Sequence, residues 1–218
     1  MPVTRGGRPA RYLRGMETEN PGAALSAAEL EQFYAEALTV EAYWADMFDE
    51  GPRPTGPYDD YLRINRARAT RVRKSVVLEP EVMARALAAP PETRWLVVTE
   101  HWCGDSAQVL PVLDAIAAAS AGRITLKVAF RDHDVRLIDA FLTNGGRSIP
   151  KVIALGVDGS VEGVWGPRPA VATELVRALK ANPETAPQYG EHLHKWYAAD
   201  KTLSTQREAV EALIQNPG

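Results

Sequence analysis

The sequence predicts an α/β fold in which a mixed β-sheet is flanked by helices. Across residues 93–181, short apolar segments with strand character alternate with helical segments, as in right-handed units of parallel strands. The last two strands flank the pair Asp158–Gly159, which is typical of a β-hairpin and adds an antiparallel strand. We therefore expect the order β-α-β-α-β-β-α, a mixed four-stranded sheet, and extra helices at both ends of the chain.

Composition narrows the class of protein. The chain has 218 residues and a net charge of -3, which gives no reason to expect binding to nucleic acid or an anionic membrane. Its one cysteine cannot form an internal disulfide, and this suits a reducing cytosol. No segment approaches the run of about 18 apolar residues that spans a membrane. We expect a cytoplasmic protein, and the sequence leaves its oligomeric state open.

Residues 1–22 carry four arginines and no apolar segment of a signal peptide. The pattern favours a basic flexible tail over a basic arm for an acidic partner. Translation from Met16 instead of Met1 is an alternative explanation of the same segment.

The first helix begins at a capping box, because Ser26 and Glu29 have the required spacing. Apolar residues then recur at helical spacing as far as Met47. The following segment, residues 49–57, contains three prolines and two glycines and is predicted to be a loop.

A second helix is predicted over residues 58–74 and is dense in cations. We interpret them as a solvated helix face, with arginine stems lying on apolar surface, in preference to a site for an acidic partner. A third helix opens at Pro80, since proline is favoured at a first helical position, and runs to Leu87. Together these helices form an N-terminal extension, residues 23–90. The cations of the second helix are Arg63, Arg66, Arg68, Arg71, Arg73 and Lys74.

The central domain, residues 91–182, opens with a buried strand at 94–100, which is short, apolar and β-branched. An alanine-rich helix with an apolar stripe follows at 106–119, and alternation predicts a strand at 124–130. The remaining elements are a short helix at 134–142, a loop at 144–150, strands at 151–156 and 161–165, and a helix at 169–180. Beyond a break at 183–190, two helices at 191–201 and 204–215 are predicted to form a C-terminal extension, residues 183–218.

Cys103 falls where the first strand of this domain runs into the following helix. Free backbone N–H groups and the positive end of the helix dipole converge there. They predict a thiol pKa below the free value of about 8.5 and hence a reactive thiolate. Gly104 permits a tight turn, Ser106 is placed to donate to the sulfur one turn later, and Asp105 opposes thiolate formation if it lies close.

Two prolines favour the interpretation of Cys103 as a reactive cysteine over its interpretation as a buried, inert one. Pro111 lies inside an apolar helix, where proline costs ~3 kcal/mol. The pair Ile149–Pro150 precedes the third strand, where a cis proline would form a wall beside the sulfur.

On these residues the segment resembles the thioredoxin superfamily over residues 93–181, fewer than half of the chain. The segments "LTNGGRSIPKVI" and "HKWYAADKTLSTQ" are similar to a bacterial subgroup with helical extensions at both ends. The matching positions are Trp102-Cys103-Gly104-x-Ser106 against the pattern W-C-G-x-C, Pro111 against the proline of the active-site helix, Ile149–Pro150 against the cis-proline pair, and Gly166 against a glycine after the last strand.

The resemblance implies that Cys103 is the nucleophile and that the backbone of Ile149 pairs with the substrate. Two departures limit what it implies: Ser106 replaces the resolving cysteine, and the preceding strand lacks the family's buried acid. The expected activity is therefore monothiol thiol–disulfide exchange. Cys103 attacks a disulfide of a protein client or a thiolated protein, and a low-molecular-weight thiol from solution releases it. No bound cofactor is expected.

The candidate catalytic residues are Cys103 and Ser106. Arg147 and Lys151 are either contacts for the carboxylate of a small thiol or simple surface charges. The candidate substrate-binding residues are Trp102, Gly104, Ile149, Pro150 and Arg147.

Two other functions remain open: a non-catalytic adaptor that holds clients, and an iron–sulfur carrier resembling monothiol glutaredoxins. His101 is a less favoured general base for Cys103. The segment 131–134 and the pair His192 and His194 lack a supporting third ligand, so no metal site is predicted.

Overall fold

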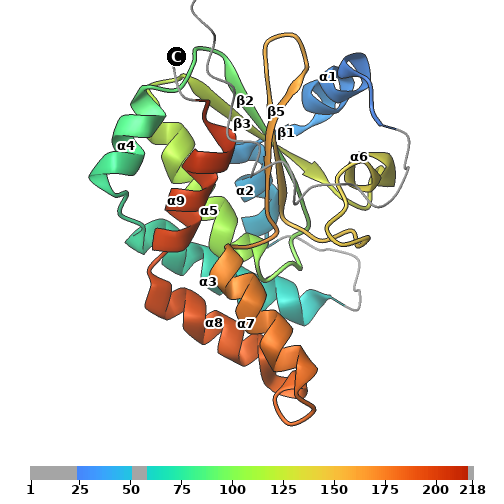
Figure 1. The fold of residues 1–218 in the computed structure, drawn as a ribbon, viewed down its shortest axis with the longest axis vertical. Helices are drawn as coiled ribbons and strands as arrows, with labels where there is room; N and C mark the ends of the chain where they lie inside the picture. The colour runs from blue at the N-terminus through green and yellow to red at the C-terminus, as the bar shows by residue number, and fades with distance from the viewer. Residues whose placement is uncertain (1–23, 51–57, 216–218) are drawn as a thin grey trace, which may run out of the picture.

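The structure is a computed structural model that describes residues 24–50 and 58–215 (Figure 1). The predicted tail, residues 1–22, lies outside the described residues. The helices are α1 Ala27–Glu36, α2 Val40–Phe48, α3 Asp59–Ser75, α4 Pro80–Leu87, α5 Ser106–Ala119, α6 Val135–Asp139, α7 Ala170–Ala181, α8 Tyr189–Asp200 and α9 Leu203–Leu213, with a 3-10 turn at Ala186–Gln188. The strands are β1 Leu38–Thr39, β2 Thr93–Thr99, β3 Ile124–Phe130, β4 Lys151–Leu155 and β5 Val161–Trp165.

The sheet is mixed, as predicted, and has five strands in the order β1-β3-β2-β4-β5. Strands β2 and β3 are parallel, and the other neighbours are antiparallel. The hairpin expected at Asp158–Gly159 joins β4 to β5. The fold is therefore the expected α/β core with one additional edge strand.

That edge strand, β1, corrects the prediction of one continuous helix from Ser26 to Met47. The chain leaves α1 at Ala37, and Leu38 pairs with Val128 of β3. Thr39 then starts a new helix, because its side chain accepts a hydrogen bond from the Ala42 N–H at 3.2 Å. Helical periodicity on either side conceals this break, since pairing with β3 is a tertiary contact.

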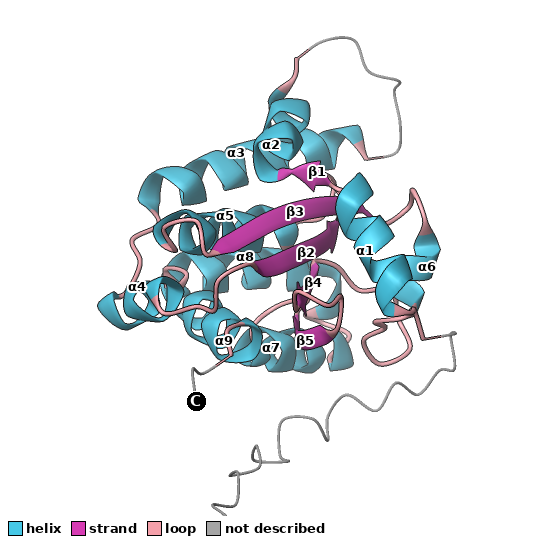
Figure 2. Ribbon diagram, turned by 90° about the horizontal axis from the view of Figure 1, so that it is seen from above, coloured by secondary structure: helices cyan, strands magenta, loops and turns pink. Residues whose placement is uncertain are grey.

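The helices form two layers on the sheet (Figure 2). Side chains alternate along β2, so Leu96 and Val98 face α1 and α6, whereas Trp95 and Val97 face the larger layer. That larger layer contains α5 and helices of both terminal extensions, which share one hydrophobic core with it. The extensions are thus built onto the sheet's main core.

The cations of α3 are only partly a solvated face. Arg63, Arg71, Arg73 and Lys74 are exposed, but Arg66 donates to the Met47 carbonyl at 2.6 Å. Arg71 donates to the Gln108 side chain at 2.8 Å. These arginines tie α3 to neighbouring elements, and the arginine-rich composition of the helix does not reveal this.

Across residues 24–50 and 58–215, no helix has both the length and the apolar character needed to cross a membrane.

Candidate active site

Cys103 lies in the turn between β2 and α5, at the start of the helix as predicted. Its thiol donates to the carbonyl oxygen of Ile149 at 3.3 Å, and its sulfur accepts from the N–H of Ser106 at 3.5 Å. The side chain of Cys103 is buried, with 8% of the residue exposed. The Ile149–Pro150 peptide bond beside it is cis. The structure therefore brings together Cys103, Ser106 and Ile149, three residues that the sequence predicted for one site.

The predicted direction of the thiol pKa is wrong. Burial raises the pKa of Cys103 to about 11, and the carboxylate of Asp105 acts in the same direction. Hydrogen bonds from Ser106 and from the backbone of Asp105 lower the pKa but do not compensate. The helix position alone suggested a stabilised thiolate, whereas removal of the sulfur from water dominates.

Ser106 occupies the position expected of a donor to the sulfur. Its hydroxyl accepts a hydrogen bond from Thr99 of β2 at 2.5 Å, which leaves the hydroxyl hydrogen available. Both its side chain and its backbone form hydrogen bonds with the sulfur, and both hydrogen bonds lower the pKa of the Cys103 thiol. Thr99 thus orients Ser106, a role that the sequence did not indicate.

Asp105 is buried at the start of α5 and is held by two residues from distant parts of the chain. Arg168, which follows β5, forms an ion pair with it and donates through Nε at 3.1 Å. Tyr197 of α8 donates to its other carboxylate oxygen at 2.8 Å. Sequence reasoning missed both partners, because no local pattern links residues so far apart in the chain.

Gly166 lets the segment after β5 approach the cis-proline loop. Its φ is +111°, and an added Cβ would lie 2.3 Å from the carbonyl oxygen of Pro150. A side chain at this position would therefore displace Pro150, which is joined to the residue that contacts the sulfur. The Gly166–Pro167 peptide bond is also cis.

A pocket of about 700 Å³ opens over Cys103. Its walls come from α3, from the turn before α5, from the cis-proline loop and from the segment leading into α8. Trp102 stacks on Tyr58 with ring centroids 4.9 Å apart, and the guanidinium of Arg131 lies 4.9 Å from its ring. The residues of the cysteine turn and the cis-proline loop that line it are Trp102, Cys103, Gly104, Asp105, Arg147, Ser148 and Ile149.

The two candidate carboxylate contacts separate in the structure. Arg147 lines the pocket and pairs with Asp139 at 2.6 Å. Lys151 is buried in β4 outside the pocket lining, donates to Thr143 at 2.6 Å, and has a pKa lowered to about 8 by burial. Lys151 is thus neither a pocket contact nor a surface charge.

His101 does not face the sulfur. Its Nε2 lies 2.7 Å from a carboxylate oxygen of Asp46, and its ring packs on Tyr43 and Phe130. Within residues 24–50 and 58–215, no cluster of three or more metal-ligating side chains occurs. In the segment 131–134, Asp134 accepts from the Arg136 N–H at 3.0 Å and caps α6.

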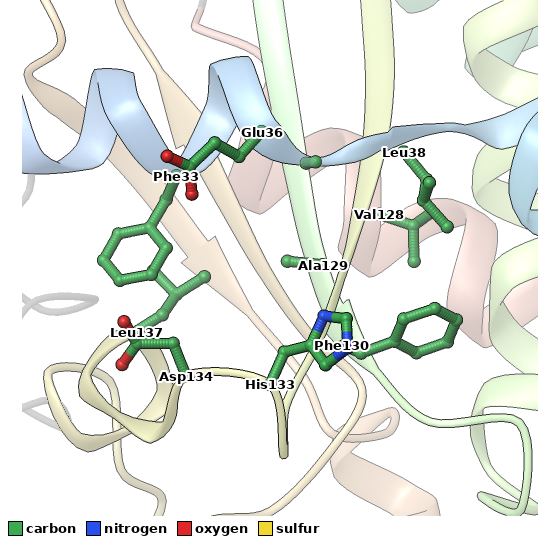
Figure 3. A pocket seen from close by; sticks show the side chains of 10 residues that line it. Phe33, Glu36, Leu38, Val128, Ala129, Phe130, His133, Asp134 and Leu137 are labelled. Carbon is green, nitrogen blue, oxygen red and sulfur yellow. The ribbon is translucent and has the colours of Figure 1, made fainter.

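A second, smaller pocket of about 210 Å³ lies among α1, β1, β3 and the start of α6 (Figure 3). Apolar side chains such as Phe33 and Leu137 line it, with Glu36, His133 and Asp134 at its lining as well. It does not include Cys103, so the larger pocket is the candidate active site.

Comparison with known proteins agrees with this geometry. A family model described as thioredoxin matches residues 51–181, and so begins well before residue 91, where the central domain was expected to start. No curated protein matches the chain. A crystal structure of a protein of unknown function from Pseudomonas aeruginosa is similar, with a TM-score of 0.59 and 19% identity, covering 86% of this chain and 96% of that chain.

An HIV epitope scaffold is also similar, with a TM-score of 0.56, 19% identity and the same coverage of both chains. At such identity these two likenesses support the fold alone. The family match spans more than half of the sequence and contains the cysteine turn, the cis-proline loop and the closing hairpin. The chain therefore belongs to the thioredoxin family.

Proposed function

We propose that this protein performs thiol–disulfide exchange by a monothiol route through Cys103. The observation that carries the proposal is the contact between the Cys103 sulfur and the backbone of Ile149 at the floor of an open pocket. A disulfide that enters the pocket meets the sulfur and an adjacent backbone edge together. Cys103 is the only cysteine in the sequence, so the mixed disulfide that forms must be released by a thiol from solution.

The raised thiol pKa makes this exchange slow in the free protein. With a pKa of about 11, only a very small fraction of the protein carries the thiolate at neutral pH. A more basic thiolate is a stronger nucleophile, which recovers part of this loss, but it is also a poorer leaving group. Both reaction with Cys103 and release from it are therefore slow, and the mixed disulfide is long-lived.

The same observation favours a second candidate, an adaptor that retains a client as a stable mixed disulfide. Ser106 cannot attack the adduct, and the buried sulfur resists leaving as a thiolate. The two candidates differ only in whether an external thiol completes the cycle within a useful time.

Two measurements on the full chain test the proposal. The first is the rate of iodoacetamide alkylation of Cys103 as a function of pH. We expect this rate to keep increasing with pH well into the alkaline range. The second is the removal of glutathione from a glutathionylated peptide in the presence of excess glutathione, with Cys103→Ser as the control.

Turnover that requires Cys103 supports the oxidoreductase. A lasting adduct on Cys103 without turnover supports the adaptor. A protein that forms no mixed disulfide with any disulfide tested contradicts both candidates.

A further inference from the structure

Four arginines line the pocket over Cys103, and three of them are matched by carboxylates. Arg131 pairs with Asp132, Arg147 with Asp139 and Arg168 with Asp105. The fourth is Arg68 of α3. Among residues 24–50 and 58–215 it has no carboxylate within ion-pair distance, and its Nη1 donates at 2.9 Å to the neutral side chain of Asn65. Arg68 therefore presents a half-buried positive charge to the pocket without a carboxylate in direct contact, and Asp105 acts on it only from a greater distance.

His194 of α8 faces the same point from the opposite wall. Gln108 accepts from Arg71 through its side-chain oxygen, so its amide nitrogen donates to Nδ1 of His194 at 3.2 Å. Since Nδ1 accepts, the hydrogen of the neutral ring resides on Nε2. Burial and the nearby Arg68 lower the pKa of His194 to about 4, so the ring is neutral near pH 7.

The side chains of His194 and Arg68 both lie against Gly104, the residue next to Cys103. A Cβ built on Gly104 would lie 3.0 Å from Nε2 of His194 and 3.3 Å from Nη1 of Arg68. Cys103, Gly104, Arg68 and His194 line one pocket, so an anion bound by Arg68 and His194 shares that pocket with the reacting sulfur. This common pocket favours a ligand that carries its charge close to its own sulfur.

An internal cysteine of a protein client does not itself meet that constraint, because the groups bonded to its α-carbon are uncharged backbone amides and a carboxylate comes only from a neighbouring side chain. A free small thiol does meet it when a carboxylate is separated from its sulfur by two or three carbon atoms. A volume of about 700 Å³ also suits a small molecule. We propose that Arg68 and His194 select, as the thiol exchanged with Cys103, a small thiol with a carboxylate close to its sulfur.

This inference rests on the proposed exchange at Cys103. In the step concerned, Cys103 loses its proton to solvent and its thiolate attacks a symmetrical disulfide of the small thiol. One S–S bond breaks, a new bond joins Cys103 to one half, and the other half leaves as a thiolate that takes up a proton. The donors on α3 and α8 bind the carboxylate of the half that remains.

Three disulfides of nearly equal shape test the selection: dithiodipropionate with two carboxylates, hydroxyethyl disulfide with none, and cystamine with two ammonium groups. The rate of adduct formation on Cys103 is measured by mass spectrometry at mildly alkaline pH. Each rate is divided by that of an unstructured cysteine peptide, which removes intrinsic differences among the probes. We expect the order dithiodipropionate, hydroxyethyl disulfide, cystamine.

Arg68→Gln should lower the relative rate with dithiodipropionate about tenfold, as expected for loss of a charge-assisted hydrogen bond, and leave hydroxyethyl disulfide unchanged. Arg63→Gln is the matched control, because it removes the same charge from an exposed position on the same helix. His194→Leu should reduce the same preference by a smaller factor. Thermal unfolding of each variant establishes that it is folded.

The outcomes separate the two proposals. Loss of the preference in Arg68→Gln but not in Arg63→Gln supports the inference. Equal relative rates for the three probes, or equal effects of the two variants, overturn it while the proposed function stands. Faster reaction of a protein disulfide than of dithiodipropionate overturns the small-thiol assignment. No adduct with any probe overturns the proposed function itself.

Discussion

The thiol of Cys103 donates to the carbonyl oxygen of Ile149, 3.3 Å away. A carbonyl oxygen accepts a hydrogen bond from a thiol but cannot donate one to a thiolate. This contact therefore favours the protonated form of the sulfur. The same carbonyl belongs to the backbone expected to pair with a substrate. A substrate that takes up the Ile149 backbone therefore removes a contact that holds Cys103 in its unreactive form.

Asp105→Asn should lower the pKa of Cys103, because the carboxylate of Asp105 acts with burial to raise it. The substitution also leaves Arg168 without its anionic partner, which favours a thiolate further. We expect the midpoint of alkylation against pH to fall by about 1 unit. Glu174→Gln, at an exposed carboxylate of α7, is the control. A midpoint that stays in place would show that Asp105 does not act on the sulfur.

Ser106→Cys should convert the site into a dithiol, since the N–H of residue 106 already lies 3.5 Å from the Cys103 sulfur. Oxidation should then form an internal disulfide with the loss of two hydrogen atoms, measured by intact mass. Adducts on Cys103 should become short-lived, because the second sulfur attacks them. In Ser106→Ala the adduct should persist, and the pKa of Cys103 should rise as hydrogen bonding to it weakens. Adducts equally stable in both variants would contradict this explanation.

Gly166→Ala should disturb the cis-proline loop, because its Cβ would lie 2.3 Å from the Pro150 carbonyl oxygen. Gly145→Ala is the matched control, since Gly145 also has a positive φ, of +72°, but nothing within 4 Å of its added Cβ. Gly145→Ala should lose about 1–2 kcal/mol to backbone strain, and Gly166→Ala at least as much, because its φ of +111° lies outside the left-handed helical region. Gly166→Ala should lose about 1–3 kcal/mol more through overpacking, measured by denaturant unfolding. Equal losses would mean that the close approach is unimportant.

His194 should make stability fall on mild acidification. Its pKa is lowered from 6.5 to about 4 in the folded protein, so the unfolded chain binds a proton first as the pH drops. As the pH falls from about 6.5 to about 4, the free energy of unfolding should decrease by at most about 3 kcal/mol. Below pH 4 this contribution should level off. His194→Gln should remove this component, whereas His192→Gln, on the same helix but exposed, is the comparison. If the free energy of unfolding depended on pH in the same way in the wild type and in His194→Gln, the role of His194 would be contradicted.

Local patterns predicted most of the secondary structure, because they are set by short-range physics. The capping box at Ser26, the proline that opens α4, the helix at Ser106–Ala119 and the Asp158–Gly159 hairpin are all found where the sequence places them. The break at Ala37 was missed, since pairing of Leu38 with β3 outweighs the helical periodicity around it. Helix α6 is also shorter than expected.

The active site was only half predictable. The cysteine turn and the cis-proline pair have local signatures, and the structure brings them into contact. The pKa of Cys103 depends on burial and on Asp105, neither of which the helix position reveals. The pocket wall supplied by Arg68 and His194 comes from the two terminal extensions, and sequence spacing gives no sign that these meet.

The two edges of the sheet differ in how much backbone they offer to another chain. β1 pairs with β3 over two residues at one edge. At the other edge β5 has five residues, and the carbonyl of its Glu162 accepts from the Gln215 side chain at 2.7 Å. A short edge strand leaves little backbone for a foreign strand to pair with. By supplying β1, the break in the first helix covers Lys127 and Val128 of β3 with a strand too short to be a good template for another chain, a consequence separate from any chemistry at Cys103.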